Sequence, residues 1–499
     1  MKNRNTMFTT ILLALGCFVI APVARALVPP PDGGYSGHNT AEGDGALNSL
    51  PPNVRGPHDN TALGYHTLFN LSTGVSNTAI GSEALLNNIN GSRNTATGVE
   101  ALFHNTVDGN TAYGYQALFN NTTGGPNTAI GDLALRSNTE GNGNTAVGSG
   151  ALIGNTTGDG NTAVGVGTLQ SNTTGDSNTA VGSGALASNT SAGQNTALGR
   201  EALSRNTAGG NTAVGSAALH LNIDGSDNTA TGFLALASNT TGNHNTALGN
   251  LALFANTEGS DNTAIGYDSL AVDNFGGNTA IGVKALEITS GDLNTAVGYL
   301  ALVNNTVGDS NVAVGVGAGA NVTAAGGVIC IGSYGANVNL SCFIGNIRGV
   351  QTQNANAIPV LIDSNDQLGT QSSSRRFKRD IKPMDKASKA ILALNPVTFH
   401  YKSDKTNTRQ FGLVAEEVAA VSPDLVVRDA NGDIYTVRYE AVNAMLLNEF
   451  LKEHRTVEEL KKEIAALTAT VKEQAAQIQR VSVQIKARKP FPQVVVNER

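Results

Sequence analysis

The sequence is poor in tryptophan, cysteine and charge. Its 499 residues contain no Trp, three Cys and only 14% charged residues. Cys330 and Cys342 lie far from the N-terminus, and neither has histidines beside it at the spacing of metal ligands. Beyond the first 26 residues, no apolar run is long enough to span a membrane as a helix. The sequence therefore predicts no metal site, no cofactor and no membrane span in the mature chain.

The few charges are divided unevenly along the chain. Residues 1–372 carry 10 Lys and Arg against 23 Asp and Glu, whereas residues 373–499 carry 22 against 16. Such a break indicates a domain boundary near residue 372. The acidic excess of the first part argues against binding to nucleic acid, which requires a basic surface.

Glycine is abundant, with 58 residues, and much of it belongs to a repeat. The phrase Asn-Thr-Ala-x-Gly-x-x-Ala-Leu occurs in 16 copies from Asn60 to Asn311, the last one altered, at a spacing of 17 or occasionally 16 residues. A period this short and regular is typical of a solenoid, in which each repeat forms one coil stacked on the next. Residues 57–320 are therefore predicted to form a mainly β rod.

Within each repeat we expect two short strands joined by tight turns. Thr145–Gly148 is an example of the first strand, Ala151-Leu152 belongs to the second, and Asn155–Gly158 is the turn. Sixteen coils at about 4.8 Å each would give a rod of roughly 75 Å. Two apolar rows are predicted to form the core. One is the position after Ala, and the other is the nearly invariant Leu: Ile80, Ile130, Val147, Val164, Leu198 and Ile265 in the first, and Leu85, Leu118, Leu152, Leu203, Leu253 and Leu302 in the second.

Ligand-binding roles for the repeat find little support in its pattern. A calcium-binding β-roll needs Asp at a fixed place in a Gly-rich nonapeptide, whereas Asp159, Asp176 and Asp227 are scattered. Ice binding would use regular threonine rows, but only one threonine of the repeat is invariant. A glycosidase needs paired carboxylates, and the acidic residues stand at irregular places. We interpret the repeated Asn and Thr as residues that serve the backbone in stacks and turns.

The N-terminus has the features of an export signal. Lys2 and Arg4 precede an apolar run, and Ala24-Arg25-Ala26 provides small residues for cleavage after Ala26. We expect residues 1–26 to be a signal peptide and residues 27–56 a linker. The order of residues before Cys17 does not favour a lipoprotein site. The mature chain is expected at the cell surface or outside the cell.

After Val314-Gly315 the period dissolves. Residues 321–372 hold β-rich fragments, which predicts a neck between the rod and the C-terminal part. In an exported protein Cys330 and Cys342 could form a disulfide, but buried free thiols fit the sequence equally well.

The C-terminal part, residues 373–455, is predicted to be a small α+β domain. We expect a short helix that Asp385 caps and Asn395-Pro396 ends, a strand over 398–401, a strand leading into a helix over 410–418, and a hairpin turned at 431–433. A long helix starts near Glu440.

Residues 456–489 of that helix follow heptads, and residues 490–499 form a tail. The a positions are Val457, Ile464, Val471, Ile478 and Ile485, and the d positions are Leu460, Leu467, Gln474 and Val481. The alternation of three and four residues does not slip, which predicts a coiled coil. These side chains leave two and three strands both open.

Three motifs of this part resemble a known family. They are Ser-Ser-x-Arg-x-Lys at 373–378, Gln-x-Gly-Leu-x-Ala-Glu-Glu-Val at 410–418 and Tyr-x-Ala-x-Asn-x-x-Leu-Leu at 439–447. In this order before a coiled coil, they are similar to the C-terminal intramolecular chaperone of phage endosialidases and tail fibres, a self-cleaving Ser–Lys peptidase. The resemblance implies a trimeric domain that templates the upstream β-structure and is then released.

The same resemblance implies the residues that would cut the chain. Cleavage would fall between Ser372 and Ser373, with Ser373 as the nucleophile and Lys378 as its general base. Neighbouring arginines would favour the neutral form of this lysine once the site is packed. The family often has Asp after the nucleophile, whereas this chain has Ser374, which leaves open a chaperone that no longer cleaves. His400 is interpreted as a strand residue, because no Cys or carboxylate stands at triad spacing from it.

The repeats, in turn, resemble the heads of trimeric autotransporter adhesins, which form left-handed parallel β-rolls as trimers, although those repeats are slightly shorter. Together the two resemblances predict an exported homotrimeric fibre whose partners are its own copies and a surface glycan or host receptor. The alternative is a phage-type tail fibre or tailspike with glycan-binding or glycan-cleaving activity on the rod.

Overall fold

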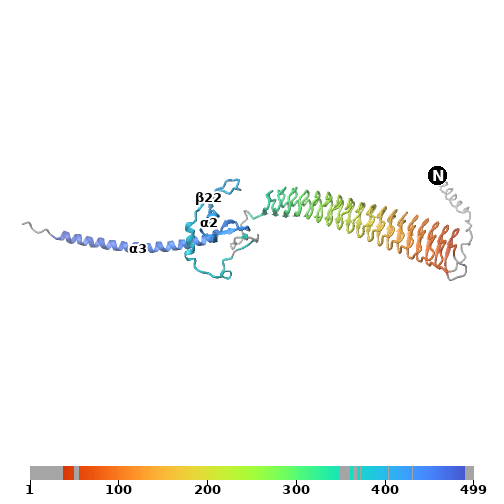
Figure 1. Ribbon diagram of the computed structural model, residues 1–499, viewed down its shortest axis with the longest axis horizontal. Coiled ribbons are helices and arrows are strands. Elements are labelled where there is room, and N and C mark those ends of the chain that lie inside the picture. The colour runs from red at the N-terminus through yellow and green to blue at the C-terminus, as the bar shows by residue number, and fades with distance from the viewer. Residues whose placement is uncertain are drawn as a thin grey trace, which may run out of the picture. The chain divides into compact units, whose positions relative to one another are not determined.

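The computed structural model divides into two compact units, residues 1–350 and 351–499 (Figure 1). It describes residues 37–49, 56–347, 360–362, 368–370, 372–402, 404–429 and 431–488. The predicted signal peptide and the tail at 490–499 lie outside these ranges. The two units are treated separately below.

The first unit is a parallel β-solenoid, as the repeat predicts. Its single sheet has 19 strands of three residues, one per coil, and each strand pairs with the strand of the next coil so that Thr lies beside Thr and Ala beside Ala. The strands are β1 (Thr40–Glu42), β2 (Thr61–Leu63), β3 (Thr78–Ile80), β4 (Thr95–Thr97), β5 (Thr111–Tyr113), β6 (Thr128–Ile130), β7 (Thr145–Val147), β8 (Thr162–Val164), β9 (Thr179–Val181), β10 (Thr196–Leu198), β11 (Thr212–Val214), β12 (Thr229–Thr231), β13 (Thr246–Leu248), β14 (Thr263–Ile265), β15 (Thr279–Ile281), β16 (Thr295–Val297), β17 (Val312–Val314), β18 (Ile329–Ile331) and β19 (Cys342–Ile344).

The solenoid extends beyond the consensus repeats at both ends. At the N-terminal end, β1 lies in the predicted linker and pairs with β2. At the other end, β18 and β19 lie in the predicted neck and continue the same sheet. Their residues depart from the Asn-Thr-Ala phrase but keep the in–out alternation of a strand, which is why counting the phrase misses them.

The second strand expected in each coil is absent. The Ala-Leu side forms turns instead, in which residues such as Glu83 and Leu85 take the left-handed conformation with φ of 58° and 52°. Hydrogen bonds still connect the coils there, for example from Leu85 N–H to the carbonyl of Ala101 at 3.0 Å. Two left-handed residues so close together curl the chain too tightly for an extended strand.

The core prediction is half right. The Leu row is completely buried, but the second buried row is the Ala in the middle of each strand, not the residue after it. Alternation along a strand turns that following residue outward, so that Ile80 is 39% and Leu198 47% exposed. The interior of a coil therefore holds small Ala from the sheet opposite Leu from the turn side.

Asparagine fills the rest of the interior in two stacks that run from coil to coil. In the first stack, the Asn144 N–H donates to Oδ1 of Asn127 at 2.8 Å. In the second, Nδ2 of Asn155 donates to Oδ1 of Asn138 at 2.8 Å and to the carbonyl of Gly158 at 3.0 Å. These bonds satisfy buried amides that would each be costly unpaired. The interpretation of Asn as a backbone-serving residue is confirmed for these stacks.

The second stack is interrupted at the short coils. Among the described residues, the buried polar atoms without a partner include Oδ1 of Asn88, Asn189 and Asn256. Each lies one coil before a 16-residue coil. In the first of these coils, Asn105 turns its Nδ2 to the carbonyl of Val107 at 2.7 Å, and no bond to Asn88 forms. The deletion of one turn residue thus leaves a buried acceptor unsatisfied.

Restoring the missing residue is expected to stabilise the solenoid. A glycine inserted after Val107 would bring this turn to the common length and allow Asn105 to donate to Asn88. We expect a gain of about 1 kcal/mol in the free energy of unfolding, because one buried acceptor becomes paired. Thermal unfolding followed by circular dichroism measures it. The same insertion after Thr157, in a coil of 17 residues, is the control and should lower the midpoint; a loss in both would contradict the explanation.

One carboxyl group replaces an amide in the second stack. Asp273 is 2% exposed and stands where most coils have Asn. Burial raises its pKa to about 7, although N–H donors from Phe275 and Asn278 oppose the shift. The folded chain therefore holds a proton here between about pH 4 and pH 7 that the unfolded chain has released.

The sign of this linkage gives a pH prediction. The contribution of Asp273 to stability is fully present below pH 4 and is lost as the pH rises through 7. Asp273→Asn should remove that loss and stabilise the protein at pH 8 by on the order of 3–4 kcal/mol. Thermal midpoints of the variant and wild type at pH 5 and pH 8 test it. Asp309→Asn, at an exposed turn, should change neither midpoint; equal pH slopes for Asp273→Asn and wild type would contradict the prediction.

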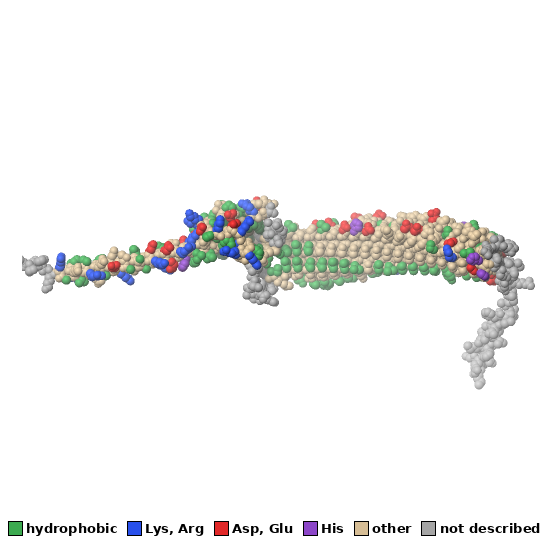
Figure 2. All heavy atoms as spheres, turned by 90° about the horizontal axis from the view of Figure 1, so that it is seen from below, with side chains coloured by type: hydrophobic (Ala, Val, Ile, Leu, Met, Phe, Trp, Pro, Cys, Tyr) green, Lys and Arg blue, Asp and Glu red, His purple; other side chains and the backbone are tan. Residues whose placement is uncertain are grey.

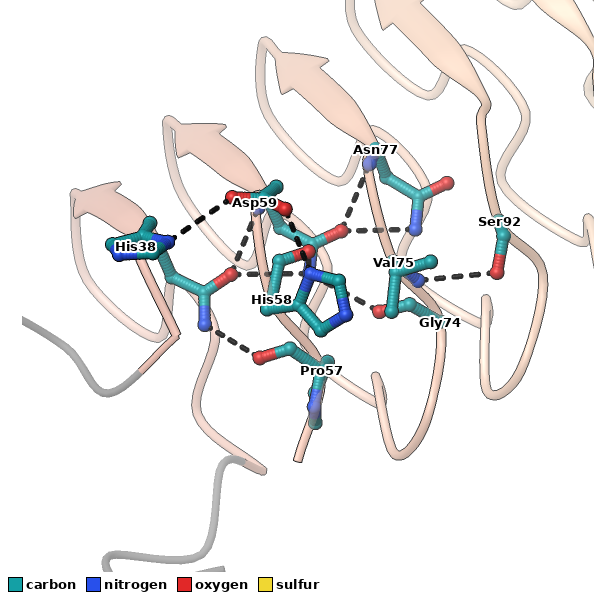
Figure 3. Close-up of polar contacts among 10 residues, drawn as sticks. His38, Pro57, His58, Asp59, Gly74, Val75, Asn77 and Ser92 are labelled. Atoms are coloured by element: carbon teal, nitrogen blue, oxygen red, sulfur yellow. Dashed lines mark hydrogen bonds and ion pairs between the residues drawn. The ribbon is translucent and has the colours of Figure 1, made fainter. Parts of the chain in front are cut away.

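The N-terminal end of the solenoid carries a small ionic group (Figure 3). Asp59 lies between two histidines, with its Oδ2 at 2.7 Å from Nδ1 of His58 and its Oδ1 at 3.4 Å from Nδ1 of His38. The hydrogen bond with His58 lowers the pKa of Asp59. All three side chains are exposed, so the group adds little to stability.

The second unit is a small α+β domain followed by one long helix. Its elements are β20 (Leu361–Ile362), β21 (Leu368–Gly369), the 3₁₀ helices η1 (Arg375–Phe377) and η2 (Asp385–Ala393), β22 (Val397–Phe399), β23 (Gln410–Gly412), α2 (Ala415–Val421), η3 (Pro423–Leu425), β24 (Val426–Arg428), β25 (Ile434–Val437) and α3 (Tyr439–Ala487). Three antiparallel pairs form, β20–β21, β22–β23 and β24–β25. Val418, Leu425, Val426, Val437 and Met445 make up the core. The predicted elements are present, but Asp385 is the first residue of η2 and makes no capping bond.

A buried polar cluster fixes η2 to α3. Ser388 is completely buried, and its Oγ is hydrogen-bonded to Glu449, to Nδ2 of Asn448 and to Nζ of Lys452. Lys452 also reaches Glu449 Oε1 at 2.6 Å, and this hydrogen bond holds the pKa of Glu449 below its usual value. The cluster positions the start of the domain against the helix that follows it.

Candidate functional site

The predicted serine and lysine are brought together in the structure. Nζ of Lys378 lies 3.0 Å from Oγ of Ser373. The turn η1 produces this contact, because Phe377 N–H bonds to the carbonyl of Ser374 and Lys378 N–H to that of Arg375. The chain thus reverses within five residues and returns the lysine to the serine. The contact is within reach for proton transfer between the two groups.

The pair opens onto a cavity of about 620 Å³ in the second unit. Ser372, on the N-terminal side of the predicted cleavage point, lines it too. The other walls come from β20, the β24–β25 hairpin and the start of α3: Leu361, Ile362, Val427, Thr436, Val437, Arg438, Glu440, Ala441 and Ala444. Residues from both sides of the predicted cut therefore meet in one hollow.

Arg438 and Glu440 are cavity residues that the sequence does not reveal. They follow the serine by more than 60 residues, and nothing in their spacing connects them to it. The Arg438 N–H bonds to the carbonyl of Leu425 at 2.8 Å, which holds the beginning of α3 against η3. Only the folded hairpin places these two charges beside the Ser–Lys pair.

The site is open to water in the single chain. Ser372, Ser373 and Lys378 are all exposed, as are the three flanking arginines. Arg376 lies over the ring of Phe377 at 4.6 Å from its centroid. This chain alone therefore supplies the contact between nucleophile and base but not the packing that the sequence interpretation expects around the lysine.

The two other recognition motifs lie against each other. Leu413 N–H, in the 410–418 motif, donates to Oη of Tyr439, the first residue of the 439–447 motif, at 3.1 Å. Sequence motifs 26 residues apart thus serve one contact between the strand β23 and the start of α3. His400 is exposed just after β22 and does not line the cavity.

The two cysteines do not form a disulfide in this fold. Cys330 faces the buried interior from the middle of β18, whereas Cys342 is the first residue of β19 and faces outward. Burial raises the pKa of Cys330. Of the two alternatives that the sequence left open, the structure has free thiols, of which only Cys330 is buried.

These features define a class of protein: a fibre-like β-solenoid with a small C-terminal module. Residues 373–427 match the family model described as chaperone of endosialidase, so this segment is a domain of that family, and the resemblance drawn from its motifs is confirmed. No curated protein and no solved structure matches the chain. The described helices include none that is both long and apolar enough for a membrane. The described ranges also bring no three His, Cys, Asp or Glu together as metal ligands.

Proposed function

We propose that the protein is an exported homotrimeric fibre whose C-terminal domain is an intramolecular trimerisation chaperone that cuts itself off before Ser373. One observation carries the proposal: the 3.0 Å contact between Lys378 Nζ and Ser373 Oγ, formed at the residue where the match to the chaperone family begins. The β-solenoid upstream of this domain fits a tail-fibre-type protein. Export rests on residues 1–26, which the structure does not describe.

The proposed reaction starts at the peptide bond between Ser372 and Ser373. Neutral Lys378 takes the proton of Ser373 Oγ, and this oxygen attacks the carbonyl carbon of Ser372. The C–N bond breaks, the Ser373 nitrogen receives the proton from Lys378, and an ester joins the two residues. Water then hydrolyses the ester, leaving a carboxylate on Ser372 and a free hydroxyl and amine on Ser373. Because nucleophile and scissile bond are adjacent in the chain, no substrate has to be recruited.

Trimerisation is proposed from the unburied heptad face of α3. All a residues of the predicted coiled coil and every apolar d residue are exposed in the single chain, with Ile464 at 64% and Leu467 at 69%. A helix with such a stripe is stabilised by packing it against the same stripe of other helices. Assembly would also cover surfaces of this unit and remove water from the open Ser–Lys pair, so that cleavage follows assembly.

The products of expression test the proposal. The intact mass should show a C-terminal fragment of about 14 kDa that begins with Ser373. Native mass spectrometry of the same sample should give three rods per particle. A single uncut chain would contradict self-cleavage, and a particle of one chain would contradict the trimer. A trimer that stays uncut would favour a chaperone without peptidase activity, the second candidate, which Ser374 in place of the family's Asp supports.

A further inference from the structure

The outward side of the solenoid sheet carries an apolar face that nothing covers. It consists of the first and third residues of each strand from β2 to β19, here called the outward sheet face. The first residue is Thr in β2 to β16, and the third is usually Val, Ile or Leu. Ile130, Leu248 and Val314 are 41–46% exposed although they belong to the most regular rows of the repeat.

No charge interrupts this face. None of the first and third strand residues from β2 to β19 is Asp, Glu, Lys or Arg. Towards its C-terminal end the face becomes fully apolar, because Val312 and Ile329 replace Thr. Figure 2 shows hydrophobic side chains in a continuous band along one long edge of the solenoid and charged side chains along the opposite edge. A surface kept apolar over such a length marks an interface.

The length and period of the face restrict its occupant. Eighteen strands at about 4.8 Å extend for roughly 85 Å, and a width of three residues gives about 850 Å² per copy, the size of a standard protein interface. A partner that fits every coil must repeat at the same step along the whole face. Another copy of this solenoid has that step, and the heptad face of α3 in the same chain also requires copies.

We propose that the outward sheet face packs against the same face of other copies, in register, so that each coil meets its own counterpart. This inference rests on the proposed homotrimer and adds which surface of the rod joins its chains. The small Thr side chains would allow the sheets to approach closely, and the aliphatic row would be buried between them. In a single chain this row remains half exposed, which explains why it is hydrophobic without being part of the core of a coil.

The chain carries its own reporter for this packing. Cys342 is the first residue of β19 and therefore lies on the outward sheet face, exposed, while Cys330 is buried. Register between copies brings the Cys342 residues to the same level. A short bismaleimide linker should then join two chains through Cys342.

The test uses the full chain with Cys17→Ser and Ser373→Ala, so that one accessible thiol remains and α3 stays attached. In this background Val297→Lys, Val314→Lys and Ile331→Lys together place charges on the outward sheet face. The matched control is Ile288→Lys, Val307→Lys and Val338→Lys, which alters equally exposed hydrophobic residues of the turns. We expect efficient cross-linking in the background and in the control, and at least a tenfold loss of cross-linked dimer in the face variant, with a trimeric mass by light scattering throughout.

The outcomes separate the inference from the function on which it rests. A trimeric mass with undiminished cross-linking in the face variant would overturn the outward sheet face as the interface and leave the trimer standing. A monomeric mass of the background chain would overturn both. Circular dichroism of each variant establishes that the solenoid has folded, and Cys342→Ser must abolish the cross-link.

Discussion

Replacing Ser373 with alanine is expected to leave the chain entirely uncut. The side chain loses the only oxygen that lies 3.0 Å from Lys378 Nζ, and no nucleophile remains beside the carbonyl of Ser372. Lys378→Met should have the same effect, because the hydroxyl keeps its place but has no base to take its proton. Gel electrophoresis and intact mass of freshly made protein measure the fraction cut, which should fall from near completeness to none.

Two matched changes make this result specific. Ser374→Ala removes a neighbouring hydroxyl that has no contact with the lysine, and Ser372→Ala keeps the carbonyl under attack. Both variants should still be cut. The fragment from Ser374→Ala must begin with Ser373, which fixes the register among three consecutive serines. If Ser374→Ala instead blocked cleavage while Ser373→Ala did not, the assignment of the nucleophile would be wrong.

Cleavage should also depend on assembly, because the Ser–Lys pair is open to water in one chain. A lysine can act as a base only when its surroundings favour the neutral form, and burial is one means of achieving this. Val471→Asp with Ile478→Asp on the heptad face should therefore reduce both trimer content and cleavage, although the changes lie far along α3 from Ser373. Undiminished cleavage in a monomeric variant would show that the single chain suffices.

The sequence predicts the periodic parts of this protein well. A fixed spacing of Asn, Gly and Leu indicates a stacked coil regardless of detail, and heptads indicate a long helix from one end to the other. It also predicts the pairing of Ser373 with Lys378, because a family motif includes both within six residues. These features are local in the chain, so that the sequence carries them without knowledge of the fold.

What the sequence does not reveal depends on which side of the backbone faces inward. Ile80 and its equivalents are more hydrophobic than the Ala before them, and a reading by hydrophobicity places them in the core. The interior of one coil is narrow, however, and Leu85 and its equivalents from the turn side already fill it, so that only Ala fits from the sheet. The aliphatic row points outward because its partner is outside the single chain. Likewise, Arg438 and Glu440 reach the cavity only through the β24–β25 hairpin.

The second large effect is expected from a single methyl group in the middle of the solenoid. Gly148 follows β7 with φ of 138°, a region that residues with a side chain avoid. A Cβ added there would lie 2.4 Å from the carbonyl oxygen and 2.6 Å from the carbonyl carbon of Gly165 in the next coil. Both atoms are backbone and cannot move without opening the hydrogen bonds between the coils. Gly148→Ala should therefore destabilise the solenoid by about 4 kcal/mol or more.

Gly150→Ala provides the control two residues away. Its φ is 66°, the left-handed conformation that Leu152 in the same coil adopts with a full side chain, and a Cβ at Gly150 would meet nothing within 4 Å. We expect a change of about 1 kcal/mol at most. Thermal unfolding and limited proteolysis should show an early transition and a new cut near residue 148 in Gly148→Ala alone. Equal stability of the two variants would mean that the coils can separate locally at little cost, contrary to a stack in which every coil is held by its neighbours on both sides.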